Sequence, residues 1–137
     1  MNLEAELGRL LDHEAIRALT ADYARLVIAG DGRAVGALYT EDGVFKAGVA
    51  HVVGRAKLQD FLAGALTPGK SIPLVVNHLI EVTGDEATCV CTMFTPWYRD
   101  ETPGFCGDYR DRLRRVDGRW YFAERDFIFH QGRPAGA

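Results

Sequence analysis

The sequence of 137 residues predicts one α+β domain, in which N-terminal helices close the concave face of a curved, mostly antiparallel sheet of about six strands. Amphipathic helical stretches dominate the first half of the chain, and strand-like stretches dominate the second half. Asp117-Gly118 lies between two of these stretches and is a strong signal for a hairpin turn. Helices that precede a strand meander are typical of α+β domains. We expect the fold to enclose a pocket for a small apolar molecule.

Four helices are expected in the first half of the chain. Asn2 suits the N-cap of the first helix and Asp12 that of the second, because their side chains can accept hydrogen bonds from free backbone N–H groups. The second helix is the main one, and it carries an apolar stripe at helical spacing that includes Tyr23. The predicted helices span residues 3–11, 13–29, 33–39 and 55–66.

Six strands are expected. Two are short, the first beginning at Val44-Phe45 and the second at 51–53. The other four are long and should pair as two hairpins, one turning at 84–86 and one at Asp117-Gly118. The long predicted strands span residues 72–83, 87–99, 105–116 and 119–130.

A two-residue turn at Asp117-Gly118 would pair Val116 with Arg119 and decide which side chains share a face. Because basic residues gather on one face, we expect the other face to meet the helices. The predicted inner face carries Tyr109, Asp111, Leu113, Trp120, Phe122, Glu124, Asp126 and Ile128, and the outer face carries Arg110, Arg112, Arg114, Arg119, Tyr121 and Arg125.

The three carboxylates of the predicted inner face have two interpretations. Ionised carboxylates are rarely buried without partners, so they could bind inward-reaching arginines or backbone amides near the sheet rim. A β-bulge could also turn Glu124 or Asp126 outward. Asp111 lies between Tyr109 and Leu113, and this central position favours a carboxylate that serves the pocket.

Two other side chains are candidates for chemistry. His78 falls on an otherwise apolar face with Cys89, Cys91 and Met93 if the first hairpin has a two-residue turn. A lone histidine on such a face is usually a core residue, but a neighbouring Asp would make it a plausible acid or base. Tyr23 is either a core aromatic residue or a phenol that donates to a substrate oxygen.

Composition and charge exclude several classes of function. The net charge of −3 gives no basis for binding nucleic acid or acidic membranes. The odd cysteine count, three, predicts reduced thiols in a cytoplasmic protein, and Cys89-Val90-Cys91 has no second ligand pair for a metal. No leader and no stretch of about 20 apolar residues is visible. We expect one domain over 1–131 and a flexible tail over 132–137.

Several short motifs, in their order along the chain, resemble the SnoaL-like domains of the nuclear-transport-factor-2-like (NTF2-like) superfamily. The resemblance covers about residues 3–130 and includes an opening segment that runs from Tyr23 to Phe45. Its motifs are Tyr23 with Gly30-Asp31, residues 38–45 (LYTEDGVF), Gly54-Arg55, His78 with 84–87 (GDEA), Tyr109-Arg110-Asp111 and 117–120 (DGRW).

This resemblance implies a cone-shaped α+β barrel and chemistry without a metal or organic cofactor. Enzymes of the superfamily include polyketide cyclases, scytalone dehydratase, ketosteroid isomerase and limonene-epoxide hydrolase, and other members only bind ligands. By position, His78 is similar to a pocket histidine of scytalone dehydratase, and Tyr23 to the oxyanion-hole tyrosine of ketosteroid isomerase.

The sequence departs from both of these enzymes at the other positions. The two aspartates of the isomerase fall near Ala47 and Tyr109. The second histidine of the dehydratase falls near Cys91, and its helix aspartate falls near Ile28. The chain therefore does not carry the full catalytic set of either enzyme.

Three functions remain open on this basis. The first is a cofactor-independent acid/base enzyme (lyase, dehydratase, isomerase or cyclase) for a small hydrophobic aromatic, polyketide or terpenoid-like substrate. The second is a noncatalytic binding module, and the third is a small structural subunit of a ring-hydroxylating dioxygenase. The expected catalytic residues are His78, Asp111, Tyr23 and Tyr109, and the expected substrate-binding residues are Trp97, Cys91, Phe61, Trp120 and Met93.

The outer sheet face predicts a homodimer. Strict alternation places Tyr121, Phe127 and Phe129 on that face among charged residues, which would expose an apolar patch at one end of the sheet. A second copy of the chain would cover it.

Overall fold

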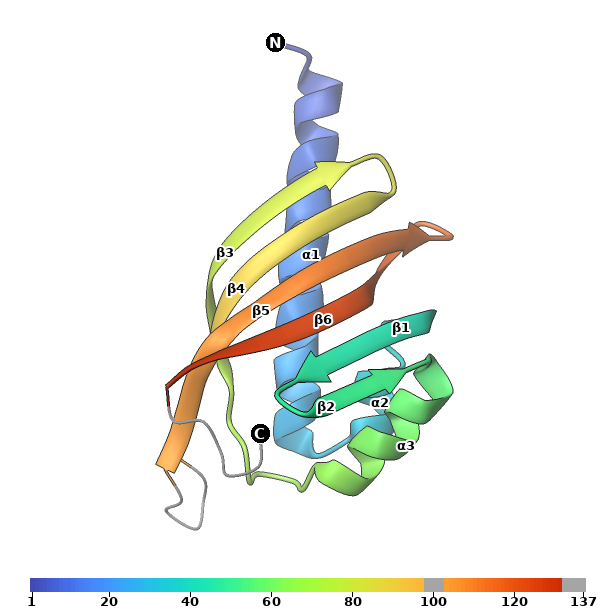
Figure 1. Ribbon diagram of the computed structural model, residues 1–137. Coiled ribbons are helices and arrows are strands. Elements are labelled where there is room, and N and C mark those ends of the chain that lie inside the picture. The colour runs from blue at the N-terminus through green and yellow to red at the C-terminus, as the bar shows by residue number, and fades with distance from the viewer. Residues whose placement is uncertain (98–102, 132–137) are drawn as a thin grey trace.

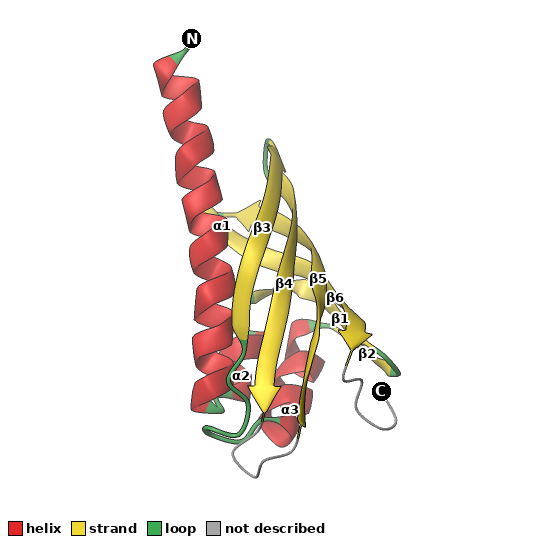
Figure 2. Ribbon diagram, turned by 90° about the vertical axis from the view of Figure 1, so that its left-hand side faces the viewer, coloured by secondary structure: helices red, strands yellow, loops and turns green. Residues whose placement is uncertain are grey.

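The computed structural model describes residues 1–97 and 103–131, and these form one six-stranded sheet with three helices on one of its faces (Figures 1 and 2). The predicted α+β class is therefore confirmed. The strand order is β2-β1-β6-β5-β4-β3. The elements are α1 (Leu3–Ala29), α2 (Gly32–Gly36), β1 (Tyr39–Ala47), β2 (Ala50–Val53), α3 (Arg55–Ala65), β3 (Leu74–Thr83), β4 (Glu86–Trp97), β5 (Pro103–Val116) and β6 (Arg119–Gln131).

Helix α1 is one continuous helix of 27 residues, so the predicted break at Asp12 is wrong. Asn2 does cap its start and accepts a hydrogen bond from the N–H of Ala5. Asp12 lies inside the helix because no glycine or proline interrupts the chain there and because its carboxylate binds the sheet instead. Gly30 ends the helix with φ of 71°, a conformation that glycine adopts without strain.

The apolar stripe of α1 packs on the concave face of the sheet. Ile16, Leu19 and Tyr23 are buried there, together with Leu113 and Phe122 from the sheet. The first turns of α1 extend beyond the sheet, as both ribbon views show. None of the helices in the described part of the chain is long and apolar enough to cross a membrane.

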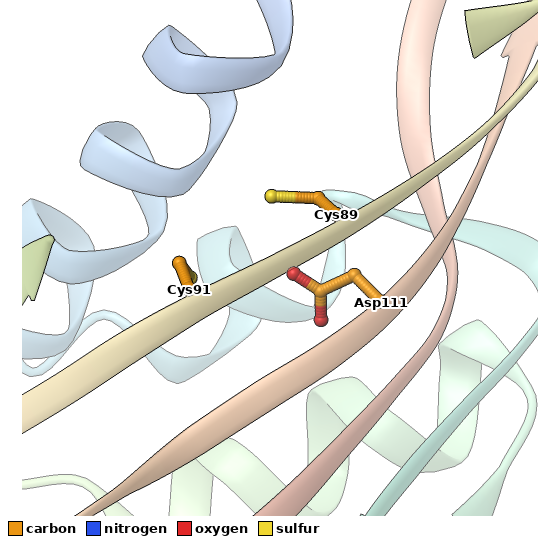
Figure 3. Close-up of side chains that lie close together, drawn as sticks. All are labelled: Cys89, Cys91 and Asp111. Atoms are coloured by element: carbon orange, nitrogen blue, oxygen red, sulfur yellow. The ribbon is translucent and has the colours of Figure 1, made fainter. Parts of the chain in front are cut away.

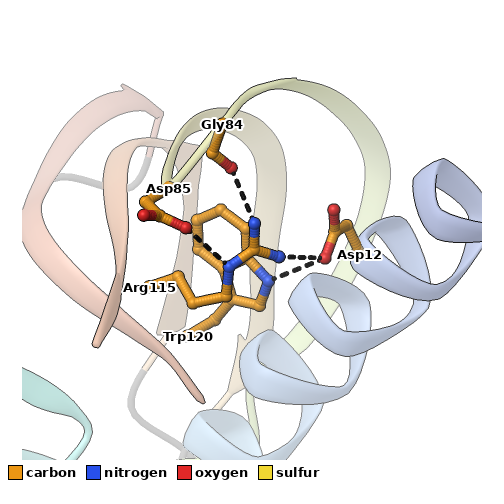
Figure 4. A network of polar contacts seen from close by, with 5 residues as sticks. All are labelled: Asp12, Gly84, Asp85, Arg115 and Trp120. Carbon is orange, nitrogen blue, oxygen red and sulfur yellow. Dashed lines mark hydrogen bonds and ion pairs between the residues drawn. The ribbon is translucent and has the colours of Figure 1, made fainter. Parts of the chain in front are cut away.

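A polar network joins the middle of α1 to two hairpin turns (Figure 4). The Arg115 guanidinium donates to Asp12 at 2.6 Å, to Asp85 at 2.9 Å and to the Gly84 carbonyl at 3.0 Å. The indole N–H of Trp120 also donates to Asp12, at 3.3 Å. Asp12 thereby ties the helix to both long hairpins.

Strand β1 begins earlier than predicted, because Tyr39 belongs to it rather than to a helix over 33–39. It pairs in parallel with β6, with Tyr39 beside Phe122. The N–H of Phe122 donates to the carbonyl of Leu38. This long-range pairing extends the strand, and local sequence gives no sign of it.

Both predicted hairpins are present. Asp117 and Gly118 have φ of 51° and 77°, and Val116 pairs with Arg119, as a two-residue turn of this kind requires. In the other hairpin, Thr83 pairs with Glu86 across the turn. Each turn sets the register of its own hairpin as far as the first bulge, between Val76 and Leu79 in β3 and between Arg112 and Leu113 opposite β6.

A one-residue β-bulge at Ala123 reverses the side-chain alternation in the rest of β6. Leu113 pairs with Phe122 but Arg112 pairs with Glu124, so Ala123 has no partner on β5. Beyond the bulge, inward and outward positions are exchanged relative to the prediction. Arg125, Phe127 and Phe129 face the helices, while Glu124, Asp126 and Ile128 belong to the other face.

Because of this bulge, the predicted inner and outer faces of β6 are wrong beyond Ala123. Glu124 lies near Lys46 and Arg112, at 3.3 and 3.6 Å, and does not point inward. Phe127 is only 4% exposed, so it contributes nothing to an outer patch. The homodimer stays a prediction, but the surface proposed for it loses Phe127 and Phe129. The predicted tail over 132–137 lies outside the described residues.

Candidate functional site

A cavity of about 370 Å³ lies between the helices and the concave face of the sheet. Side chains from α1, α3 and the strands β1, β3, β4, β5 and β6 line it. Most of this lining is apolar, including Leu62, Val75, Met93, Phe127 and Phe129. The polar lining residues are Thr20, Tyr23, Thr67, Lys70, Ser71, Tyr109 and Arg125.

Three of the nine predicted site residues line this cavity: Tyr23, Tyr109 and Met93. His78, Asp111 and Cys91 are behind the lining, in contact with residues that belong to it. Trp120 is buried near Asp12, and Phe61 is 41% exposed beside Phe45. The side chain of Trp97 lies outside the described residues.

The predicted inner carboxylate, Asp111, forms a buried ion pair with Arg125. Arg125 Nε donates to Asp111 Oδ1 at 2.8 Å, and Nη2 donates to Oδ2 at 3.1 Å. Both side chains are 0% exposed. The pair follows from the bulge, since Asp111 and Arg125 are register partners on the inner face. Asp111 therefore contacts an arginine, as the structural interpretation of the sequence allowed, and not His78.

Burial and the ion pair shift both pKa values. Burial raises the pKa of the Asp111 carboxyl, although the charge of Arg125 and its hydrogen bonds act in the opposite direction. Burial alone would lower the pKa of Arg125, but the nearby Asp111 carboxylate raises it well above its ordinary value. Arg125 is therefore charged at every pH at which the protein is folded.

Three aromatic rings surround the Arg125 guanidinium. Its central carbon lies 3.5 Å from the ring centroid of Tyr109, 4.2 Å from that of Phe122 and 4.4 Å from that of Tyr23. Such contacts between a cation and ring faces are favourable when water is excluded. The rings and Asp111 together fix the plane of the guanidinium.

One nitrogen of this guanidinium has no hydrogen-bond partner. Nε and Nη2 bind Asp111, and Nη2 also contacts Cys91 Sγ at 3.9 Å. Nη1 is buried and unpartnered. Because a buried donor without an acceptor costs free energy, about 1–3 kcal/mol or more for a charged group, this atom needs an explanation.

His78 binds a residue of the cavity wall. Its Nε2 lies 2.8 Å from Thr20 Oγ1, and Thr20 also donates to the carbonyl of Arg17 at 2.8 Å. Because a hydroxyl has a single proton, Nε2 is assigned as the donor to Thr20, which leaves Nδ1 as an acceptor. Burial lowers the pKa of His78, and the charges of Arg17 and Arg125 lower it further.

The hydroxyls of Tyr23 and Tyr39 share a hydrogen bond of 2.9 Å. Burial raises the pKa of both phenols, and the pKa of Tyr109 is raised for the same reason. All three therefore stay protonated near neutral pH, and they can donate hydrogen bonds but do not act as bases.

Cys89, Cys91 and Asp111 form a second buried cluster on β4 and β5 (Figure 3). Their potential metal-ligating atoms lie within 4.8 Å of one another. A hydrogen bond from Cys89 lowers the pKa of Cys91, and the same interaction raises that of Cys89. Both oxygens of Asp111 already bind Arg125, which competes with any cation for this carboxylate.

Sequence reasoning missed Arg125 and placed it on the outer face. The available signal was Asp111 itself, since a central inner carboxylate requires a cationic or amide partner. Arg125 is the register partner of Asp111 only when Ala123 is left out of the pairing. Strict alternation could not reveal this.

Comparison with known proteins identifies the family. The model of the SnoaL-like domain matches residues 8–126. A search of curated proteins gives no match. An NTF2-like protein with a cystatin-like fold from Novosphingobium aromaticivorans is 29% identical, with a TM-score of 0.83 over 98% of this chain and 92% of that chain.

Two other solved structures have enzyme names. A proposed scytalone dehydratase from Novosphingobium aromaticivorans is 25% identical, with a TM-score of 0.78 over 90% of this chain and 87% of that chain. A hexachlorocyclohexane dehydrochlorinase (LinA, type 2) is 19% identical, with a TM-score of 0.77 over 96% of this chain and 99% of that chain. At this identity the likeness shows the fold alone. The chain belongs to the SnoaL-like domain family and has the NTF2-like cone fold.

Proposed function

We propose that the protein binds a small, largely apolar organic molecule in the cavity between its helices and sheet. The observation that carries this proposal is the cavity of about 370 Å³ with its aliphatic and aromatic lining. Ligand pockets commonly have volumes of about 300–1,000 Å³, apolar walls and a few polar groups that orient the ligand. Thr20, Tyr109 and Arg125 are such groups here.

Internal partners of the predicted catalytic residues favour binding over chemistry. Asp111 binds Arg125, Tyr23 binds Tyr39, and His78 binds Thr20. None of the described lining residues is a carboxylate. A general base of the expected kind is therefore not in direct contact with the cavity.

A proton-transfer enzyme without a cofactor is the second candidate. Thr20 lines the cavity and lies 2.8 Å from His78, so a rotation of either side chain would let the imidazole approach a bound substrate. The lowered pKa keeps His78 neutral near pH 7, as a base requires. Structures with the same fold include a proposed dehydratase and a dehydrochlorinase. In this role Asp111 holds Arg125 and does not titrate with His78.

A matched pair of variants tests binding in the cavity. Val75 lines the cavity, and its neighbour Val76 is 48% exposed on the other face of β3. Val75→Phe should fill part of the cavity and weaken binding of tetralin, an uncharged bicyclic hydrocarbon, by about tenfold or more. Val76→Phe adds the same group outside the cavity and should leave binding unchanged.

Calorimetric titration of tetralin measures the dissociation constants of these variants. Equal affinities for the wild type and Val75→Phe would contradict the cavity as the binding site. The enzyme candidate is tested by His78→Gln in a turnover assay on ligands that bind. If the wild type converts such a ligand and His78→Gln converts it at the same rate, His78 takes no part in the reaction.

A further inference from the structure

We propose that the side of α1 that faces away from the sheet binds a second copy of this chain, so that the two α1 helices pair in antiparallel orientation. The residues concerned follow one another at alternating spacings of four and three, which is the spacing of a seam between two paired helices. This outer stripe consists of Leu7, Leu11, Glu14, Ala18, Ala21, Arg25 and Ile28. None of its residues lines the cavity, so the inference does not depend on the proposed function.

Helix α1 is apolar on two opposite sides. Ile16, Leu19 and Tyr23 are buried against the sheet, and the outer stripe lies on the opposite side of the helix, since 3.6 residues make one turn. All residues of the stripe are exposed except Ile28, which is half-buried. Figure 2 shows the sheet and the other helices on one side of α1, with its other side open. A surface helix normally has a single apolar side, so the second one favours a partner.

The outer stripe is complementary to itself when it is inverted. A two-fold axis between Ala18 and Ala21 places Ala18 of one copy against Ala21 of the other. The same axis places Glu14 against Arg25, and Leu11 against Ile28. Each pair occurs twice, as the contacts of a two-fold dimer must. The stripe therefore has the sequence symmetry that pairing with its own copy requires.

The charges of the stripe select the antiparallel orientation. In a parallel pair, Glu14 would face Glu14 and Arg25 would face Arg25, and like charges in contact are destabilising. In the antiparallel pair, each Glu14 faces an Arg25. Within its own chain, neither residue has an ion pair with another described residue. Both charges are therefore available to a second copy.

The apolar members of the stripe suit close packing of two helices. The small side chains of Ala18 and Ala21 permit a short distance between the helix axes at the centre. Leu11, which is 62% exposed in the single copy, would be covered by Ile28 of the other. The seam from Leu11 to Ile28 is about 26 Å long at a rise of about 1.5 Å per residue. Such a narrow interface is small, so we expect a dissociation constant in the micromolar range.

A matched pair of leucine variants tests where the two copies meet. Leu11 in the outer stripe is 62% exposed, and Leu79 on the outer face of the sheet, in β3, is 65% exposed. Leu11→Glu should raise the dissociation constant of the dimer by about tenfold or more, because it puts a charge into the seam at two symmetric positions. Leu79→Glu makes the same change outside the seam and should leave it unchanged. Sedimentation equilibrium measures both constants.

A charge exchange tests the orientation. Glu14→Arg alone, or Arg25→Glu alone, places like charges opposite each other at two positions and should weaken the dimer by about fivefold or more. The double variant Glu14→Arg with Arg25→Glu restores opposite charges and should recover the affinity of the wild type. These positions are exposed, so the variants should keep the fold, which circular dichroism checks.

Each of the other outcomes would contradict the inference. A wild type that stays monomeric throughout the micromolar range would overturn it. Weakening by Leu79→Glu and not by Leu11→Glu would place the contact between copies on the outer sheet face instead. If the double charge variant is as weak as the single ones, the two helices do not pair in the antiparallel register.

Discussion

The ion pair between Asp111 and Arg125 gives the sharpest prediction about stability. Both side chains are 0% exposed and share two hydrogen bonds, so solvent does not screen the interaction. Removing one partner from such a pair leaves a buried charge and costs about 3–5 kcal/mol of unfolding free energy. Removing both partners in favour of apolar side chains is often nearly neutral.

The two single variants should differ in their pH dependence. In Asp111→Leu, Arg125 keeps its proton because the pKa of a guanidinium is too high to release it, so the loss of about 3–5 kcal/mol persists at all pH values. In Arg125→Met, Asp111 can take up a proton, since burial raises the pKa of this carboxyl even in the wild type.

The direction of this pH effect follows from proton linkage. A folded-state pKa above the unfolded value of about 3.9 means that the folded state binds the proton more tightly. The contribution to stability is then fully present below the unfolded pKa and is lost as the pH rises through the folded pKa. Arg125→Met should therefore regain stability as the pH falls from 7 toward 5, and Asp111→Leu should not.

Urea denaturation of the wild type, both single variants and the double variant at pH 5 and pH 7 measures these free energies. The double variant should lose far less than the sum of the single losses, which a double-mutant cycle reports as coupling. Strictly additive losses, or single losses below about 1 kcal/mol, would show that the two charges do not depend on each other as described.

Three further predictions concern the rest of the fold. The lowered pKa of His78 gives the wild type stability that is present above the unfolded pKa of about 6.5 and is lost as the pH falls. In His78→Gln the unfolding free energy should therefore decrease less below about pH 6.5 than in the wild type. Urea denaturation between about pH 5 and 7.5 measures this pH dependence. Asp12→Ala should lower the unfolding free energy by about 1–3 kcal/mol in urea denaturation, since it removes the acceptor of Arg115 and Trp120. An unchanged denaturation midpoint would show that the network in Figure 4 does not stabilise the fold. Gly118→Ala should lose about 1–2 kcal/mol, because φ of 77° is strained for a residue with a Cβ; a thermal midpoint equal to that of the wild type would argue against this turn conformation.

The sequence by itself determined the features that depend on neighbouring residues. The alternation of β5 placed Tyr109, Asp111 and Leu113 inside, because successive side chains of a strand point to opposite faces. Asp117-Gly118 predicted the turn, since both residues tolerate positive φ. The apolar spacing of α1 predicted its buried face, including Tyr23. These local rules were sufficient for the fold class.

The tertiary structure alone decided the chemistry of the site. A bulge at Ala123 depends on how β6 matches two neighbours at once, β5 on one side and β1 on the other, and no local propensity encodes that match. The extra residue turns Arg125 inward onto Asp111 and removes Phe127 from the outer face. A shift of one residue exchanges every later side chain between the two faces of a strand. This single contact-dependent feature therefore decided between the two interpretations of Asp111 and made it the partner of a buried arginine rather than a carboxylate that serves the pocket.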